Sequence, residues 1–127
     1  MDMGQAKYIL VGEDDKFYGK IYLTKFPKEG LDVKVVTDGQ QVLDELKARR
    51  PDLLLLDMVM PVKDGFAVLS EIHKDPGLSD LKVIVLSSLG QEEDTKKAIE
   101  LGANDYIVKT NVSIGEIVDK VKSFLVN

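Results

Sequence analysis

The sequence has no cysteine and only one histidine, His73, among its 127 residues. The absence of cysteine excludes a disulfide framework and any cysteine-ligated metal site. His73 lies on the polar side of a segment with helical spacing, with no acidic or hydroxyl partner nearby in that pattern. We therefore expect His73 to be a solvated surface residue rather than a phosphate carrier.

Long apolar runs are also absent. No stretch is long enough to span a bilayer, and the first residues contain no apolar segment of the kind that a secretory signal peptide needs. We expect a cytoplasmic protein without membrane insertion. The net charge of -5 disfavours direct nucleic-acid binding, because phosphate backbones are bound by clustered Lys and Arg.

The length allows one globular domain with a substantial core and is too short for two. Hydrophobic residues make up 44% of the chain and charged residues 31%, which is ordinary for such a domain. There is no linker, repeat or low-complexity tract. We predict a single domain over residues 1–127.

Five short segments rich in Val, Ile and Leu are predicted to be strands, since each is bounded by Gly, Pro, Asp or Ser. They are residues 8–12, 31–37, 51–57, 81–88 and 105–109. Their nearly continuous apolar character is typical of a parallel sheet that is covered on both faces. Segments with helical spacing separate them and follow the last, so the pattern predicts an α/β fold of five β–α repeats.

Capping residues indicate where several helices begin and end. Ser113 with Glu116 forms a capping box for the last helix, and Asp38 with Gln41 offers a similar start for the second. Gly102 fits the left-handed position that ends the fourth helix.

Acidic, hydroxyl and basic side chains follow four of the five predicted strands. Because the C-terminal ends of parallel strands lie at one edge of the sheet, where open α/β folds bind ligands, these side chains should meet in one crevice. They are Glu13, Asp14 and Asp15 after the first strand, Asp57 after the third, Ser87 and Ser88 after the fourth, and Lys109 after the fifth.

Asp57 ends a run of four leucines, which would be a poor way to stop a strand if stability alone mattered. Crowded, partly desolvated carboxylates repel one another unless a cation relieves them. Mg²⁺ suits this role, because it takes oxygen ligands and keeps waters that a phosphate can replace. A metal and Lys109 would neutralise the oxygens of a transferred group, so the residues predict phosphoryl chemistry on Asp57.

Five motifs, in this order and at these intervals, resemble the receiver domain of two-component response regulators. They are ILVGEDD at 9–15, DMVMPVKDGF at 57–66, VIVLSS at 83–88, GANDYIVK at 102–109, and the capped final helix. The resemblance covers essentially the whole chain. It implies a CheY-like, flavodoxin-like, doubly wound sheet of five parallel strands in the order 2-1-3-4-5, with helices on both faces.

The resemblance also implies a role for each residue of the metal site. Asp57 would be the phosphoacceptor that takes the phosphoryl group from a kinase phosphohistidine. Asp14 would bind Mg²⁺ directly beside Asp57, and Glu13 would hold the metal through water. The backbone carbonyl of Val59 would add another oxygen ligand.

By the same resemblance, Lys109 would pair with one phosphoryl oxygen and the Ser87 hydroxyl would bond to another. Tyr106 matches the aromatic switch position, whose ring turns inward when the hydroxyl of Ser87 moves toward the phosphate. Phosphorylation would thus be a local charge change that biases a two-state element.

Structural alternatives stay open for several of these residues. The acids at 13–15 could mark a helix N-terminus, where they complement the helix dipole, and we expect Asp15 to be that cap. Ser87, beside Ser88, could instead cap the fourth helix. Tyr106 could be half-buried strand packing.

Two positions depart from the family pattern. Thr110 follows Lys109 where the family usually has proline after a cis bond, and a cis bond before another residue costs ~2.5–4 kcal/mol. We predict a trans Lys109–Thr110 bond and an altered loop after it. Gly12 replaces a commoner β-branched residue, and it should allow closer approach of the metal loop.

Partner surfaces are less visible in the sequence. The first helix carries six large apolar residues, most of which should be core: Phe17, Tyr18, Ile21, Tyr22, Leu23 and Phe26. We expect Phe17 to be exposed near the acids, where it would touch a kinase or phosphotransfer domain. The fourth helix, at 91–101, is highly charged and should bury little and be mobile. In the family, output is read on the fourth helix, fifth strand and fifth helix.

The first functional hypothesis is a stand-alone response regulator, because the chain ends at Asn127, directly after the fifth helix, with no output domain. Its partners would be a sensor histidine kinase or histidine phosphotransfer domain and a downstream target protein. We expect a monomer, and dimerisation on phosphorylation stays open.

Two other functions compete with this one. A Mg²⁺-dependent phosphohydrolase of the haloacid-dehalogenase type would carry a second Asp two residues after the nucleophile, where this chain has Val59. We therefore expect no turnover enzyme, only slow loss of the domain's own phosphate. A degenerate adaptor would have no use for like charges gathered at one strand edge.

Overall fold

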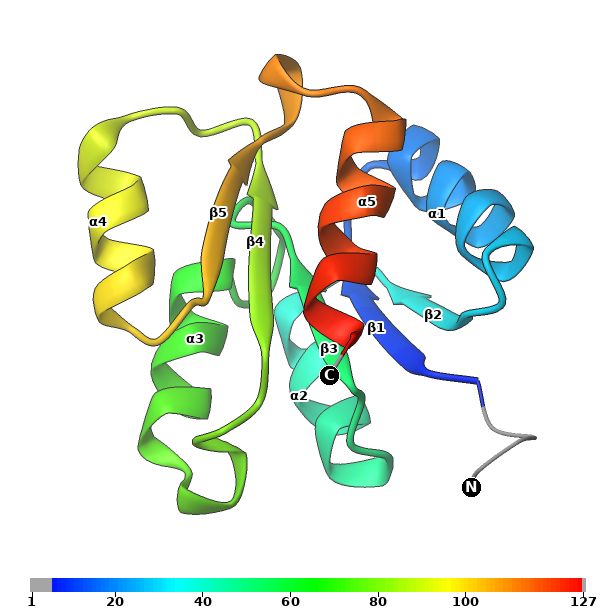
Figure 1. Ribbon diagram of the computed structural model, residues 1–127. Helices are drawn as coiled ribbons and strands as arrows, with labels where there is room; N and C mark the ends of the chain where they lie inside the picture. The colour runs from blue at the N-terminus through cyan, green and yellow to red at the C-terminus, as the bar shows by residue number, and fades with distance from the viewer. Residues whose placement is uncertain (1–5, 127) are drawn as a thin grey trace.

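The computed structural model describes residues 6–126. Five strands form one parallel sheet in the order β2-β1-β3-β4-β5 (Figure 1), which confirms the predicted topology. The strands are β1 Tyr8–Gly12, β2 Asp32–Val36, β3 Leu53–Leu56, β4 Val83–Ser87 and β5 Asp105–Val108. Each lies within the segment predicted for it.

Five α-helices cover the two faces of this sheet (Figure 1). They are α1 Lys16–Lys28, α2 Gly39–Ala48, α3 Gly65–Lys74, α4 Glu92–Glu100 and α5 Ile114–Leu125, with short 3₁₀ helices at Pro76–Leu78 and Lys109–Asn111. α1 and α5 pack on one face, and α2, α3 and α4 pack on the other. Within residues 6–126, no helix is both long and apolar enough to span a membrane.

The four leucines of β3 show why the central strands are apolar throughout. Leu54 and Leu56 belong to the core beneath α2 and α3, whereas Leu53 and Leu55 belong to the core beneath α1 and α5. Successive side chains of a strand point to opposite faces, so a sheet covered twice needs apolar residues at every position.

The helix ends agree largely with the capping residues. Asp15 caps α1, and Ser113 with Glu116 forms the predicted capping box of α5. Asp38 accepts the Gln41 N–H as predicted, but the Gln41 side chain accepts the N–H of Thr37, so this pair is not a reciprocal box. Gly102 has a φ of 102°, as expected for a left-handed helix end.

Gly12 has a packing role that the sequence did not reveal. A Cβ at this position would lie 2.7 Å from Val42 Cγ2 and 3.2 Å from Leu56 Cδ1. The glycine therefore lets α2 approach the end of β1. The closer approach of the metal loop stays a prediction.

Candidate functional site

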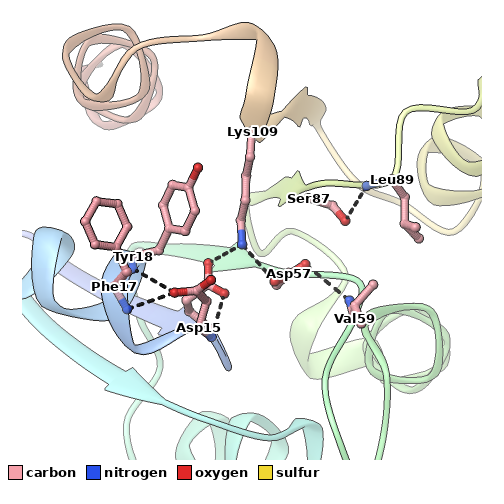
Figure 2. Close-up of polar contacts among 9 residues, drawn as sticks. Asp15, Phe17, Tyr18, Asp57, Val59, Ser87, Leu89 and Lys109 are labelled. Atoms are coloured by element: carbon pink, nitrogen blue, oxygen red, sulfur yellow. Dashed lines mark hydrogen bonds and ion pairs between the residues drawn. The ribbon is translucent and has the colours of Figure 1, made fainter.

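Glu13, Asp57 and Lys109 meet in one buried cluster at the C-terminal edge of the sheet. Figure 2 shows the Lys109 side chain reaching toward Asp57. The Lys109 Nζ lies 2.7 Å from Glu13 Oε1 and 2.9 Å from Asp57 Oδ2. Their exposed fractions are only 2%, 6% and 7% for Glu13, Asp57 and Lys109. The sequence prediction that three strand ends bring these groups together is confirmed.

Strand register places the two carboxylates side by side. Gly12 on β1 is opposite Leu56 on β3, so Glu13 and Asp57 each follow directly after paired positions. The Asp57 N–H donates to the Gly12 carbonyl at 2.9 Å, which fixes the start of the loop after β3. Lys109 follows β5 at the same edge and reaches across to both acids.

The three charges do not balance, because one ammonium group faces two carboxylates. Burial, and then the neighbouring Asp57, raise the pKa of Glu13 to about 7, against the pull of Lys109. Burial alone would lower the pKa of Lys109, but its hydrogen bonds to Glu13 and Asp57 outweigh this, and the pKa lies above its ordinary value. The site therefore holds a charged lysine that does not fully compensate the two carboxylates.

A cavity of about 260 Å³ opens beside Asp57. The residues that line it are Asp14, Asp15, Tyr18, Asp57, Val59, Ser88, Lys109 and Thr110. The Oδ1 atom of Asp57 accepts one hydrogen bond, from the Val59 N–H at 3.2 Å (Figure 2), while Oδ2 faces Lys109. The cavity thus makes the Asp57 carboxylate accessible to a small molecule.

The expected metal ligands are brought to the same place but are not gathered into a ready cluster. Among residues 6–126, no three His, Cys, Asp or Glu side chains are arranged to hold a metal ion. Asp14 is exposed and lines the cavity with Asp57. The Glu13 carboxylate is engaged by Lys109 and by the Asp15 N–H, at 3.1 Å.

This set of donors nevertheless fits a hard divalent cation, since it offers carboxylate oxygens around a cavity and an excess of negative charge. Asp14 and Asp57 both line the cavity and would be the residues to bind it directly. Glu13 would reach a cation through water, as the resemblance implies, because its own oxygens are occupied. Val59 borders the cavity, and the contact that the structure shows for it is its N–H to Asp57.

Ser87 and Tyr106 meet at the backbone of Leu89 rather than at Asp57. The Ser87 side chain is fully buried, and its Oγ accepts the Leu89 N–H at 3.2 Å (Figure 2). The Tyr106 hydroxyl donates to the Leu89 carbonyl at 2.7 Å, and burial raises the pKa of this half-buried tyrosine. Neither Ser87 nor Ser88 caps α4, which has Gln91 at its N-cap and no side-chain cap bond.

Several smaller predictions can be checked directly. Residues 6–126 contain no cis peptide bond, so Lys109–Thr110 is trans as predicted, and it lies within the 3₁₀ turn Lys109–Asn111. Phe17 is 68% exposed beside the acids, and His73 is exposed on α3. Within α4, only Ala98 is buried, as expected for so charged a helix.

Two features of the site were missed by the sequence analysis. The Tyr18 ring, one of the six apolar residues of the first helix that we expected to be mostly core, lies with its centroid 4.5 Å from Lys109 Nζ. Its place in the first turn of α1, just after the acids at 13–15, was the available signal. Val62, in the loop after Asp57, has a φ of 69°, which is unusual for a β-branched residue.

The family comparison agrees with this geometry. Residues 9–122 match the model of the response regulator receiver domain. The chain belongs to this family. In a receiver domain, the buried acid at the end of the third strand and the lysine at the end of the fifth are the positions that the resemblance had identified.

Similar proteins extend this result. The probable transcriptional regulator ycf27 of Porphyridium aerugineum is 36% identical over 121 residues, which are 95% of this chain and 49% of that protein. The chain spans less than half the length of the curated relatives it matches.

Two solved structures are informative because of the state they were captured in. The phosphorylated cyanobacterial phytochrome response regulator RcpA is 32% identical, with 95% of this chain and 94% of that chain covered and a TM-score of 0.84. The Mn²⁺-bound form of the response regulator Rcp1 is 29% identical, with coverage of 92% and 90% and a TM-score of 0.79.

Proposed function

We propose that this receiver domain accepts a phosphoryl group on Asp57 from the phosphohistidine of a sensor histidine kinase or phosphotransfer domain, in a Mg²⁺-dependent reaction. The observation that carries the proposal is the buried Asp57–Lys109 pair beside an open cavity, with Glu13 adding a second negative charge. The phosphorylated RcpA and the Mn²⁺-bound Rcp1 support it by analogy.

In the transfer step, a carboxylate oxygen of Asp57 forms a bond to phosphorus while the bond from phosphorus to the donor imidazole nitrogen breaks. That nitrogen keeps the electron pair of the broken bond. Before transfer the Lys109 ammonium is paired with Asp57, and afterwards it would pair with a phosphoryl oxygen. The backbone N–H of Val59, which donates to Asp57 Oδ1 at 3.2 Å, would be a further donor to the transferred group.

Asp14 and Asp57 would bind the divalent cation, with Glu13 behind them and the Val59 carbonyl as a further ligand. The cation, when bound, supplies positive charge to the oxygens of the transferred group. Asp14 is exposed at the cavity and Asp57 is buried behind it, so a ligand between them would be partly shielded from water.

The proposed switch runs through Leu89. Receiver domains of two-component systems act between histidine kinases and downstream effectors. For the Ser87 hydroxyl to bond to a phosphoryl oxygen, it must give up the Leu89 N–H. The Tyr106 hydroxyl donates to the carbonyl of the same residue, so both side chains are hydrogen-bonded to the loop that contains Leu89. Movement there would alter the surface of α4, β5 and α5, where a target protein would bind.

We do not propose a turnover enzyme. Val59 stands where a phosphohydrolase of the haloacid-dehalogenase type would need its second acid, and this residue is exposed at the cavity. The adaptor hypothesis is disfavoured because burying three charged groups together carries a desolvation penalty, and binding a partner without phosphorylation gives no reason for it.

The test is to incubate the protein with Mg²⁺ and a small acyl phosphate and to measure the intact mass. One added phosphoryl group is expected in the wild type and in Asp38→Asn, a control at the same sheet edge. It should be lost in Asp57→Asn and on removal of Mg²⁺ with a chelator. No added mass in the wild type would favour the adaptor, and rapid release of phosphate from many esters would favour the enzyme; either result would overturn the proposal.

A further inference from the structure

The Lys109 ammonium has a third neighbour besides its two carboxylates. The centroid of the Tyr18 ring lies 4.5 Å from Lys109 Nζ, within the range of a cation–π contact. Tyr18 also lines the cavity that holds Asp57 and Lys109. Figure 2 shows the ring standing beside the lysine side chain, on the side opposite Ser87.

The Tyr18 ring is itself held in place from behind. It lies 6.2 Å from the ring of Tyr22, which is stacked on Phe26 at 5.7 Å. Tyr22 and Phe26 are buried in the core between α1, α5 and the sheet. The ring of Phe17 packs edge-on against Tyr18 at 5.7 Å. These contacts between neighbouring aromatic rings therefore fix the position of the Tyr18 ring, against which Lys109 lies.

A fixed surface matters because a lysine side chain is flexible. Its ammonium is a point charge on a four-carbon stem, so one ion pair does not set its direction. In this chain Glu13 pulls Lys109 in competition with Asp57, and both ion pairs are short. The ring limits where the ammonium can go and leaves it facing the cavity.

We propose that Tyr18 is a positioning residue for Lys109, whose ammonium the ring face holds at the Asp57 cavity for the oxygens of an incoming phosphoryl group. This inference rests on the proposed phosphoryl transfer to Asp57. The face of the ring carries the effect rather than the hydroxyl, because the ammonium lies over the ring, 4.5 Å from its centroid. Phenylalanine at this position should therefore preserve the function of Tyr18, whereas leucine, which has no aromatic face, should not.

The first measurement is the rate at which Asp57 gains a phosphoryl group from a small acyl phosphate with Mg²⁺. We expect Tyr18→Phe to stay within about twofold of the wild type and Tyr18→Leu to be slower by about fivefold, the size of one cation–π contact. The control is Tyr8→Leu, because Arg49 lies 3.8 Å over the Tyr8 ring at the opposite end of the sheet. Its rate should be unchanged.

The second measurement asks whether Tyr18 acts through Lys109. In a Lys109→Met background, Tyr18→Leu should cause no further slowing, since the ammonium that the ring positions has gone. Equal slowing with and without Lys109 would overturn the inference, and so would a wild-type rate in Tyr18→Leu.

The third measurement needs no phosphate donor. The Cε protons of Lys109 should show an upfield ring-current shift in NMR spectra of the wild type and of Tyr18→Phe, and Tyr18→Leu should abolish it. Absence of this shift in the wild type would overturn the inference by itself. A wild type that shows the shift but takes no phosphoryl group would overturn the proposed function and, with it, the role of Tyr18. Normal transfer with an unaffected Tyr18→Leu overturns only that role.

Discussion

The Lys109 ammonium and the Tyr22 hydroxyl are both buried polar groups, but within the part of the chain that the structure describes only the first has polar partners. The Lys109 ammonium is surrounded by two carboxylates and an aromatic face. The Tyr22 hydroxyl is buried on the same side of the sheet, yet it finds no hydrogen-bond partner among residues 6–126. Burial, and then the charge of Glu13, raise the pKa of Tyr22, so its hydroxyl stays protonated. An unpaired buried hydroxyl is destabilising.

Tyr22→Phe should therefore stabilise the protein by about 1 kcal/mol, because it removes a desolvated donor and keeps the stacked ring. Urea unfolding would show a higher midpoint with an unchanged slope. Tyr18→Phe is the matched control, with a half-buried ring on the same helix, and it should leave the midpoint unchanged. A lower midpoint in Tyr22→Phe would mean that the hydroxyl has a partner.

At the scale of elements, the position of Asp57 depends on how closely α3 approaches the loop after β3. The Gly65 N–H donates to the Met58 carbonyl at 2.9 Å, and Asp64 caps the helix through the Ala67 N–H. A Cβ at Gly65 would lie 2.5 Å from the Asp57 carbonyl oxygen and 2.7 Å from Met58 Cα. These are backbone atoms, so the loop that carries Asp57 would have to move.

Gly65→Ala should lower the free energy of unfolding by about 1–3 kcal/mol, as overpacking does, and should slow phosphoryl transfer to Asp57. Gly115→Ala is the matched control, since its nearest atom outside the helix backbone would be Ser113 Oγ at 3.8 Å. Within α5 that change should raise stability by about 0.5–1 kcal/mol. Equal effects of both changes on stability and transfer would contradict the close approach.

At the scale of the whole molecule, the sequence predicted the features that follow from strand order. It did not predict the contacts that depend on the direction of individual side chains. Apolar runs and polar strand ends were enough to bring Asp57 and Lys109 together, because parallel register leaves little freedom. The contacts of Glu13 and of the Tyr18 ring with Lys109 were not predicted, because they depend on side-chain rotamers that core packing determines. The role of Gly12 likewise depends on how a distant helix packs.

The chain as a whole carries a net charge of -5, and part of that negative charge is buried at the site. Burial and Asp57 raise the pKa of Glu13 from 4.5 to about 7 in the folded protein. Between these two values, the folded state binds more protons than the unfolded state. By linkage, stability must then fall as the pH rises through this interval.

For the metal-free protein, Glu13 ionisation should therefore lower the free energy of unfolding by roughly 1–3 kcal/mol between pH 5 and pH 8, relative to Glu13→Gln. Urea unfolding at four pH values would measure this difference, and Glu100→Gln, an exposed carboxyl on α4, should follow the wild type. Mg²⁺ should recover much of the loss at pH 8, since a cation bound by Asp14 and Asp57 offsets the charge of Glu13. Identical pH dependence in Glu13→Gln and the wild type would show that the buried carboxylate is already compensated by Lys109, and the electrostatic case for a divalent cation at this site would fail.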